Sequence, residues 1–230
     1  MAYCLWTPSS LARDNHRCND LEVLTMIPLF PLGATLFPEG VLPLRVFEVR
    51  YLDMVKKCIA DGSQFGVVAL LKGSEVRTPE GHEELASYGT LAQIDEWTAP
   101  MPGLLHLRCT GTTRFALTSS EVGQFGLWRG TITELPADPS VPIPAKLQGA
   151  ATHLGKLIAG LQKDRIPEDQ MPFSRPYLLG ESGWVANRWA ELLPLAVEHK
   201  QRLLAMEDPV ERLADVHAYL EQGGLFSTNH

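Results

Sequence analysis

The sequence predicts an α+β fold: a compact β-barrel with one early helix, followed by a C-terminal helical bundle. Two observations support this. Short apolar runs separated by Gly and Pro fill the chain up to residue 135, whereas apolar residues at helical spacing fill residues 145–224. A stretch rich in proline, residues 136–144, lies between them and is predicted to be a linker. The 230 residues and the 45% hydrophobic content suffice for one large domain or two small ones.

The first half is predicted to consist of short strands. The run FGVVALL at residues 65–71 is apolar and rich in β-branched residues, which is typical of a central strand. Gly111 and Thr112 are expected to turn the chain, and the segment that follows Trp97 is expected to be a loop, since it contains Pro100 and Pro102. Further strands are predicted at residues 27–30, 44–47, 88–94, 105–109, 114–117 and 128–135.

One helix is expected inside this first half. Apolar residues from Tyr51 to Ile59 recur at helical spacing, with charged residues on the opposite side. Gly62 is predicted to end this helix, because glycine readily adopts the left-handed conformation of a helix C-terminus.

The second half is predicted to be a small helical bundle. Ser182 is a candidate cap for the second of its helices. The strongest start signal is Asp208-Pro209, an acidic N-cap followed by proline at the first helical position, and Gly223 is expected to end that helix. Helices are predicted at residues 147–161, 184–193, 195–206 and 208–223.

The charge distribution argues against a nucleic-acid partner. The formal net charge is −7, and residues 26–135 and 136–230 each hold 9 Lys and Arg against 12 Asp and Glu. Nucleic-acid binders owe much of their affinity to phosphate neutralisation and usually carry an excess of basic residues. We therefore expect no DNA partner, and RNA is disfavoured.

Cysteine usage and hydropathy exclude several further classes. No two of the four cysteines form a C-x-x-C pair, so we expect no metal site and no cofactor. Cys58 and Cys109 are interpreted as buried, small apolar residues in a reducing cytosol, so a cytoplasmic location is expected. No apolar run is long enough to span a membrane, and residues 1–25 lack the pattern of a secretory signal.

Catalytic motifs are present only as incomplete matches. Residues 149–156, GAATHLGK, have one residue too many for a phosphate-binding loop and lie within a predicted helix. Residues 180–183, GESG, lack the spacing of a nucleophile elbow, and His82 has no second His at helical distance. We therefore name no catalytic residue and expect the chain not to be an enzyme.

Three segments together resemble the N-terminal substrate-binding domain of the Lon protease family. They are the opening MIPLFPLGATLFPEGVLPLRVFEVRYL at residues 26–52, the strand GTLAQI at 89–94 and the G-x-x-R-F motif at 111–115. The resemblance covers roughly residues 26–222. It implies a twisted barrel of the PUA-like type followed by a helical bundle, as in stand-alone bacterial proteins that carry this domain without the ATPase motor and the Ser-Lys peptidase.

The two ends of the chain are predicted to lie outside the folded part. Residues 1–25 are interpreted as a flexible N-terminal extension, with Met26 as an alternative natural start, and residues 225–230 as a tail. The predicted organisation is therefore a barrel at 26–135, a linker at 136–144 and a helical bundle at 145–224.

The resemblance and the missing catalytic signals suggest a non-catalytic module that binds exposed hydrophobic segments of unfolded or tagged proteins, as an adaptor. A small-molecule or RNA-binding PUA-like module is the alternative. Trp97, Met101 and Phe37 are candidate exposed contacts, although these side chains could equally fold back onto the barrel. Arg50 and Arg114 could anchor a peptide carboxylate, or they could tie loops to backbone carbonyls and to Glu48. These residues form the candidate binding surface.

Overall fold

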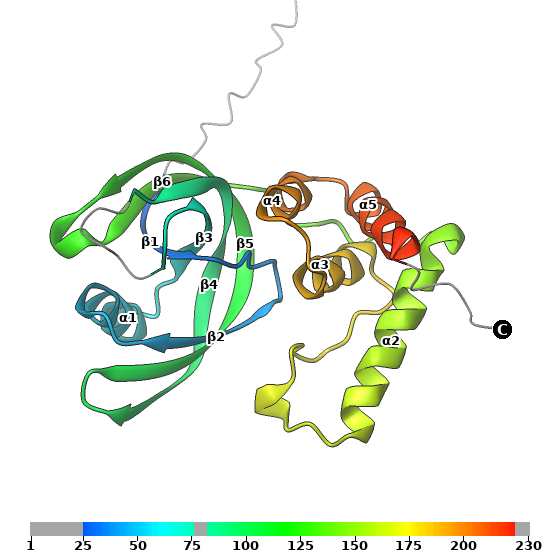
Figure 1. Ribbon diagram of the computed structural model, residues 1–230, viewed down its shortest axis with the longest axis horizontal. Helices are drawn as coiled ribbons and strands as arrows, with labels where there is room; N and C mark the ends of the chain where they lie inside the picture. Colours follow the sequence, from blue (N-terminus) through cyan, green and yellow to red (C-terminus); the bar gives the residue numbers. More distant parts are fainter. Residues whose placement is uncertain (1–24, 76–81, 224–230) are drawn as a thin grey trace, which may run out of the picture.

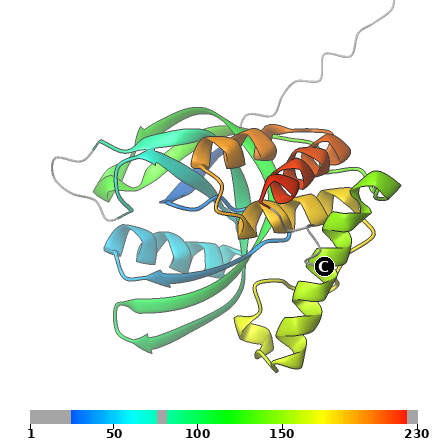
Figure 2. The same cartoon turned by 45° about the vertical axis from the view of Figure 1, so that its right-hand side comes forward.

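A computed structural model describes residues 25–75 and 82–223 of the chain. A curved β-sheet with one helix forms the first lobe, and a group of helices forms the second, packed against one side of it (Figures 1 and 2). The mixed α+β architecture with a barrel followed by helices confirms the predicted fold class. The expected extension before residue 25 and the tail after residue 224 lie outside the described residues, and the proposed domain boundaries stay a prediction.

The barrel is a six-stranded sheet that closes into a near-ring. Its strands run in the order β2-β5-β4-β3-β1-β6, and β6 also pairs with β5, which closes the ring. β3 lies at the centre of the order, parallel to β1 and antiparallel to β4, so the predicted central strand is confirmed. The bounds are Thr25–Leu32 for β1, Val41–Val46 for β2, Phe65–Lys72 for β3, Glu84–Met101 for β4, Leu104–Val122 for β5 and Trp128–Glu134 for β6.

Strand β2 is the edge strand of this sheet and lies outside the closed ring. It pairs only with the first half of β5, from Val41 opposite Thr110 to Val46 opposite Leu105. Pro43 occupies its middle, and proline carries no N–H to donate. The free edge of β2 is therefore a poor template for adding another strand.

Two long strands replace the short ones that the sequence predicted. β4 runs on through Trp97 to Met101, because that segment pairs with the start of β5 in a hairpin that turns at Gly103, where φ is +81°. The expected loop after Trp97 is thus wrong. So is the expected turn at Gly111, which lies inside the continuous strand β5.

Gly111 is required by a close backbone approach. Its N–H donates to the carbonyl of Gly40 at 2.9 Å, and its own carbonyl accepts from the N–H of Glu39 at 2.7 Å. A Cβ at this position would lie 2.3 Å from the carbonyl oxygen of Phe37, a contact that real side chains do not make. Glycine therefore lets the segment before β2 cross directly over β5.

Helix α1, Val49–Asp61, packs its apolar face into the barrel. Gly62 ends it with φ of +66°, as predicted, and its N–H donates to the carbonyl of Cys58. Cys58 and Cys109 are both free and buried in this core, which confirms their interpretation as apolar residues. Burial raises the pKa of the Cys109 thiol to about 12.

The helical half follows a segment without regular structure and contains α2, α3, α4 and α5. Their bounds are Gln148–Lys163, Ser182–Leu192, Val197–Ala205 and Pro209–Gln222, within about two residues of the predicted ranges. Asp208 caps α5 as expected, accepting from the N–H groups of Val210 and Glu211. Ser182 does not cap α3: it lies within the first turn, and its hydroxyl donates to the carbonyl of Pro142 at 3.2 Å.

Candidate functional site

Two adjoining hollows follow the free edge of β2, and together we call them the β2 groove. The barrel-mouth hollow has a volume of about 360 Å³ and the junction cavity, between barrel and helical half, about 570 Å³. Both are lined by Leu32, Ala34, Leu42 and Pro43, so these residues separate the two hollows and border both. The groove thus follows an edge strand whose polar backbone is blunted by proline.

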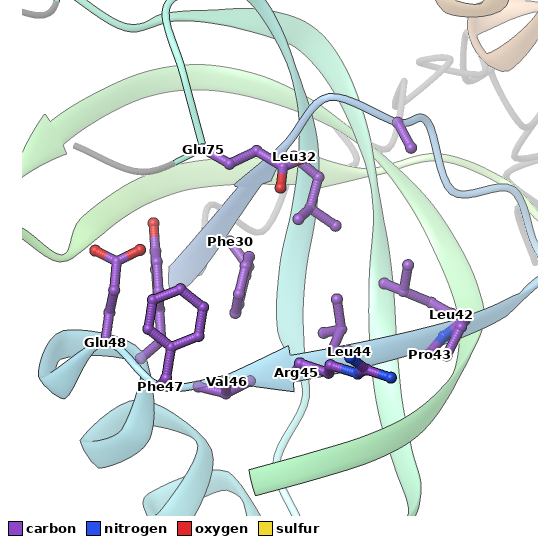
Figure 3. Close-up of a pocket in the computed structure, with 12 residues that line it drawn as sticks. Phe30, Leu32, Leu42, Pro43, Leu44, Arg45, Val46, Phe47, Glu48 and Glu75 are labelled. Carbon is purple, nitrogen blue, oxygen red and sulfur yellow. The ribbon is translucent and has the colours of Figure 1, made fainter. Parts of the chain in front are cut away.

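The barrel-mouth hollow has apolar walls and charged rims. Figure 3 shows Phe30 and Leu32 on β1 facing Leu42 and Leu44 on β2 across the hollow. Phe47, just after β2, also lines it, although 58% of its surface is exposed. The charged residues of this hollow are Arg45, Glu48 and Glu75.

The junction cavity is bounded by three parts of the chain. The barrel contributes the segment from Leu32 to Leu36, together with Val67 of β3. The segment before α3 contributes Met171 and Phe173, both buried. The helices contribute Glu191, Leu192 and Lys200, so this cavity combines an apolar wall with two opposite charges.

The side of the cavity formed by the segment between β1 and β2 is attached firmly to α3. The N–H of Phe37 donates to the carboxylate of Glu191 at 3.1 Å. Arg188 donates to the carbonyls of Pro38 and Glu39, and it pairs with Glu191 at 3.2 Å. We call this set of contacts the Glu191 junction, because that carboxylate joins the helix to the barrel segment.

Burial dominates the electrostatics of the Glu191 junction. Desolvation raises the pKa of Glu191 to about 7, although the charges of Arg188 and Lys200 and the hydrogen bond from Phe37 act in the opposite direction. Desolvation also lowers the pKa of Lys200, against the effect of the Glu191 charge. Lys200 donates to the backbone carbonyl of Glu191 at 3.2 Å.

Two buried polar atoms without a hydrogen-bond partner belong to this junction or to the cavity beside it. Among the described residues, the buried side-chain atoms that have none are Thr35 Oγ1, Arg188 Nε and Gln201 Nε2. Arg188 belongs to the junction and Thr35 lines the cavity, whereas the Gln201 side chain accepts from the N–H of Tyr88 of β4. A buried polar group left unpaired is destabilising, so this region has unused hydrogen-bonding capacity.

A second contact between the lobes, the Asp138 junction, is fully paired. Asp138 accepts from Arg114 of β5 at 2.9 Å and from both terminal nitrogens of Arg212 of α5. Arg114 also donates to the carbonyls of Leu204 and Met206. Burial and the nearby charge of Arg212 lower the pKa of Arg114. A further hollow of about 570 Å³ borders this junction.

The five predicted surface residues separate into two groups. Trp97 and Met101 are 52% and 59% exposed and lie on the β4–β5 hairpin, but neither lines the β2 groove. Phe37 is 0% exposed, so the expectation of an exposed aromatic is wrong there. The Glu191 junction draws its backbone onto α3, and its ring packs with the core of the helical half.

The two arginines lie in internal networks, as one of their two interpretations expected. Arg50 donates to Glu48 at 3.0 Å and to the carbonyl of Gly126 at 2.9 Å, and its guanidinium lies 4.5 Å from the ring centroid of Tyr51. Arg114 is committed to the Asp138 junction. Their side chains are buried, so the structure does not bring the five candidates together on one surface.

Sequence reasoning missed the residues that join the lobes: Asp138, Arg188, Glu191 and Arg212. A signal was present in part. Arg212 recurs at helical spacing with the buried residues Pro209 and Val216, and a charge on a buried helical face requires a partner. Asp138 gave no such signal, because it lies in an irregular segment where acidic residues are common.

Within residues 25–75 and 82–223, no cluster of three or more His, Cys, Asp or Glu is arranged to hold a metal ion. None of the described helices has the length and apolar character needed to cross a membrane.

Comparison with known proteins gives the family. Residues 26–222 match the family model of the ATP-dependent protease La (LON) substrate-binding domain. The crystal structure of a Lon N-terminal domain protein from Xanthomonas campestris is similar with a TM-score of 0.66 and 33% identity, covering 85% of this chain and 98% of that one. The N-terminal domain of the Mycobacterium avium complex Lon protease shares the fold, with a TM-score of 0.54 and 16% identity over 86% of this chain and 98% of that one. No curated protein sequence matches the chain. The chain belongs to the Lon substrate-binding domain family.

Proposed function

We propose that this protein is a non-catalytic module that binds exposed apolar segments of unfolded or tagged polypeptides and presents them as an adaptor. One observation carries the proposal: the β2 groove, whose two adjoining hollows have largely apolar walls. The family supports it, since its description names substrate binding, and the family match includes no ATPase or peptidase part. Its free, buried cysteines suit a reducing cytoplasm.

The dimensions of the groove suit an extended peptide. β2 has six residues, so its edge is roughly 20 Å long at about 3.3 Å per residue. Because Pro43 removes a donor from that edge, side-chain burial provides the affinity in place of strand addition. Apolar side chains of the peptide then occupy the hollows, and the charged rims set its direction.

The alternative functions receive unequal support. The charged residues of the barrel-mouth hollow are one Arg and two Glu, which repel rather than attract a phosphate backbone. A small apolar molecule remains the second candidate, because hollows of about 360 and 570 Å³ fall within the size of small-molecule sites. Thermal-shift screening against a metabolite set addresses it.

Peptide binding can be tested with a pair of exposed phenylalanines. Phe47 lines the groove, whereas Phe125 is 87% exposed and lines neither hollow of it. We expect Phe47→Ser to weaken binding of a fluorescein-labelled apolar octapeptide about fivefold to tenfold, and Phe125→Ser to leave it unchanged. Fluorescence anisotropy measures both, with an unfolded carboxymethylated protein as competitor. Absence of saturable binding by the wild type up to about 500 µM would contradict the proposal.

A further inference from the structure

Lys200 and Thr35 bring unused hydrogen-bond donors to the junction cavity. Lys200 has three N–H donors and makes one described hydrogen bond, to the backbone of Glu191. The Thr35 side chain lines the same cavity, is only 7% exposed, and its hydroxyl has no partner. The carboxylate of Glu191 is already shared between Arg188 and the N–H of Phe37.

Of the two charged residues that line the cavity, Lys200 has no ion-pair partner among the described residues, whereas Glu191 pairs with Arg188. Arg188 and Glu191 lie 3.2 Å apart and neutralise each other. Among the described residues, no carboxylate lies within ion-pair distance of Lys200, and the Glu191 charge acts on its ammonium only from farther away. An anion that enters the cavity would form a charge-assisted hydrogen bond there, strengthened by the apolar walls.

The barrel-mouth hollow carries no comparable surplus of positive charge. Glu48 and Glu75 line the barrel-mouth hollow, and Arg45 offsets only one of them. Glu48 is in turn paired with Arg50, and Glu75 accepts from the N–H of Gly33 at 2.6 Å. A bound peptide therefore meets balanced charges at the barrel-mouth hollow and the ammonium of Lys200 in the junction cavity.

We propose that the junction cavity is a carboxylate subsite, which rests on the proposed function and gives the β2 groove a direction. The peptide enters with a carboxylate beside Lys200 and Thr35, and the preceding apolar residues lie along β2 toward the barrel-mouth hollow. The substrate class is then an apolar segment that ends in a free C-terminal carboxylate or is followed by an acidic side chain.

Three peptides with one common apolar sequence test this subsite. The first carries a free C-terminal carboxylate, the second a C-terminal amide, and the third an added Glu before a C-terminal amide, each labelled with fluorescein at its N-terminus. We expect the free acid to bind the full-length protein about tenfold more tightly than the amide. If the third peptide regains the affinity, a side-chain carboxylate is accepted; if it does not, the subsite requires the C-terminus itself.

Substitutions at Lys200 connect the preference to the cavity. In Lys200→Met the acid and the amide should bind with equal affinity, and Lys200→Arg should keep the preference because it keeps the charge. Lys56→Met is the matched control, since it removes an exposed charge on α1 outside the groove. Thermal melts of each variant exclude unfolding as the cause.

The possible results separate this inference from the proposed function. Equal binding of acid and amide by the wild type, or a preference that persists in Lys200→Met, overturns the carboxylate subsite while peptide binding stands. Binding of none of the three peptides overturns both.

Discussion

The two junctions between barrel and helical half differ in how completely their polar groups are used. At the Asp138 junction one carboxylate receives two guanidiniums, which also donate to backbone carbonyls and to the side-chain oxygen of Asn187. At the Glu191 junction one carboxylate receives one guanidinium and one N–H, while Lys200 and the hydroxyl of Thr35 remain available. The first junction holds the lobes together; the second also borders the junction cavity and retains capacity for a ligand.

The difference has a physical reason. A buried ionic network stabilises a protein only when every member is satisfied, because an unpaired buried charge is strongly destabilising. A site that must accept a polar ligand therefore has to give up some stability in the free protein. Four substitutions can test this comparison.

Removal of the acceptor at the Asp138 junction should have the largest effect. Asp138→Ala leaves the buried guanidiniums of Arg114 and Arg212 without their counter-charge, and we expect the free energy of unfolding to fall by about 3–5 kcal/mol. Urea unfolding measures this. Asp53→Ala, on the exposed face of α1, is the control and should change stability by less than about 0.5 kcal/mol. If Asp138→Ala lost no more stability than this control, the Asp138 junction would not stabilise the fold.

Removal of the aromatic ring at the Glu191 junction should have the second-largest effect on stability. Phe37 is fully buried among residues of the helical half, so Phe37→Ala should reduce stability by about 3 kcal/mol through the cavity it creates. The exposed Phe47 is the matched comparison, and Phe47→Ala should change stability by less than about 0.5 kcal/mol. Chemical denaturation of both variants decides this, and equal losses would refute the placement of Phe37.

The third effect is the pH dependence of stability, which should come from Glu191 and so distinguish the two junctions. The pKa of Glu191 is about 7 in the folded protein, above the ordinary value of 4.5, so the folded state binds more protons between these values. Stability should therefore fall as pH rises from about 4.5 to about 7, by roughly 2.5 kcal/mol, and the contribution of this group should then level off.

Glu191→Gln should flatten that profile, because the amide does not titrate. Urea unfolding at intervals between pH 5 and pH 8 measures the difference between variant and wild type. Glu198→Gln, at an exposed position of α4, is the control and should preserve the slope. Parallel profiles for wild type and Glu191→Gln would show that Glu191 does not titrate in this window.

The smallest effect is expected at Thr35. Because its hydroxyl has no partner, Thr35→Val should leave the free protein equally stable or stabilise it by up to about 1 kcal/mol. The same substitution should weaken binding of the carboxylate peptide severalfold if the hydroxyl completes the subsite. A clear loss of stability in the free protein would indicate that the hydroxyl is already satisfied.

The elements that local patterns predicted well are those whose signals lie within one segment. The apolar run of β3, the glycine that ends α1 and the acidic cap of α5 each depend on neighbouring residues, and the structure confirms all three. The long strands were divided wrongly for a related reason. In the sequence, Gly111 resembles a turn residue. In the structure, glycine is needed there because the backbone of Phe37, from a distant segment, approaches β5 closely.

The candidate site was the least predictable part. Exposed Trp97 and Met101 could be found as apolar residues near prolines, but burial of Phe37 depends on Glu191, 154 residues away. The β2 groove itself combines β1, β2, β3 and the helical half, so no single stretch of sequence contains its pattern.

By itself the sequence determined the fold class and the resemblance to the Lon family, because apolar periodicity, helix caps and short motifs are local patterns that can be recognised in the sequence alone. Only the tertiary structure decided which charged side chains are paired inside the protein and which line a cavity. Pairing of a buried charge depends on what the fold places a few ångströms away, and the residues that meet at the two junctions are far apart along the chain.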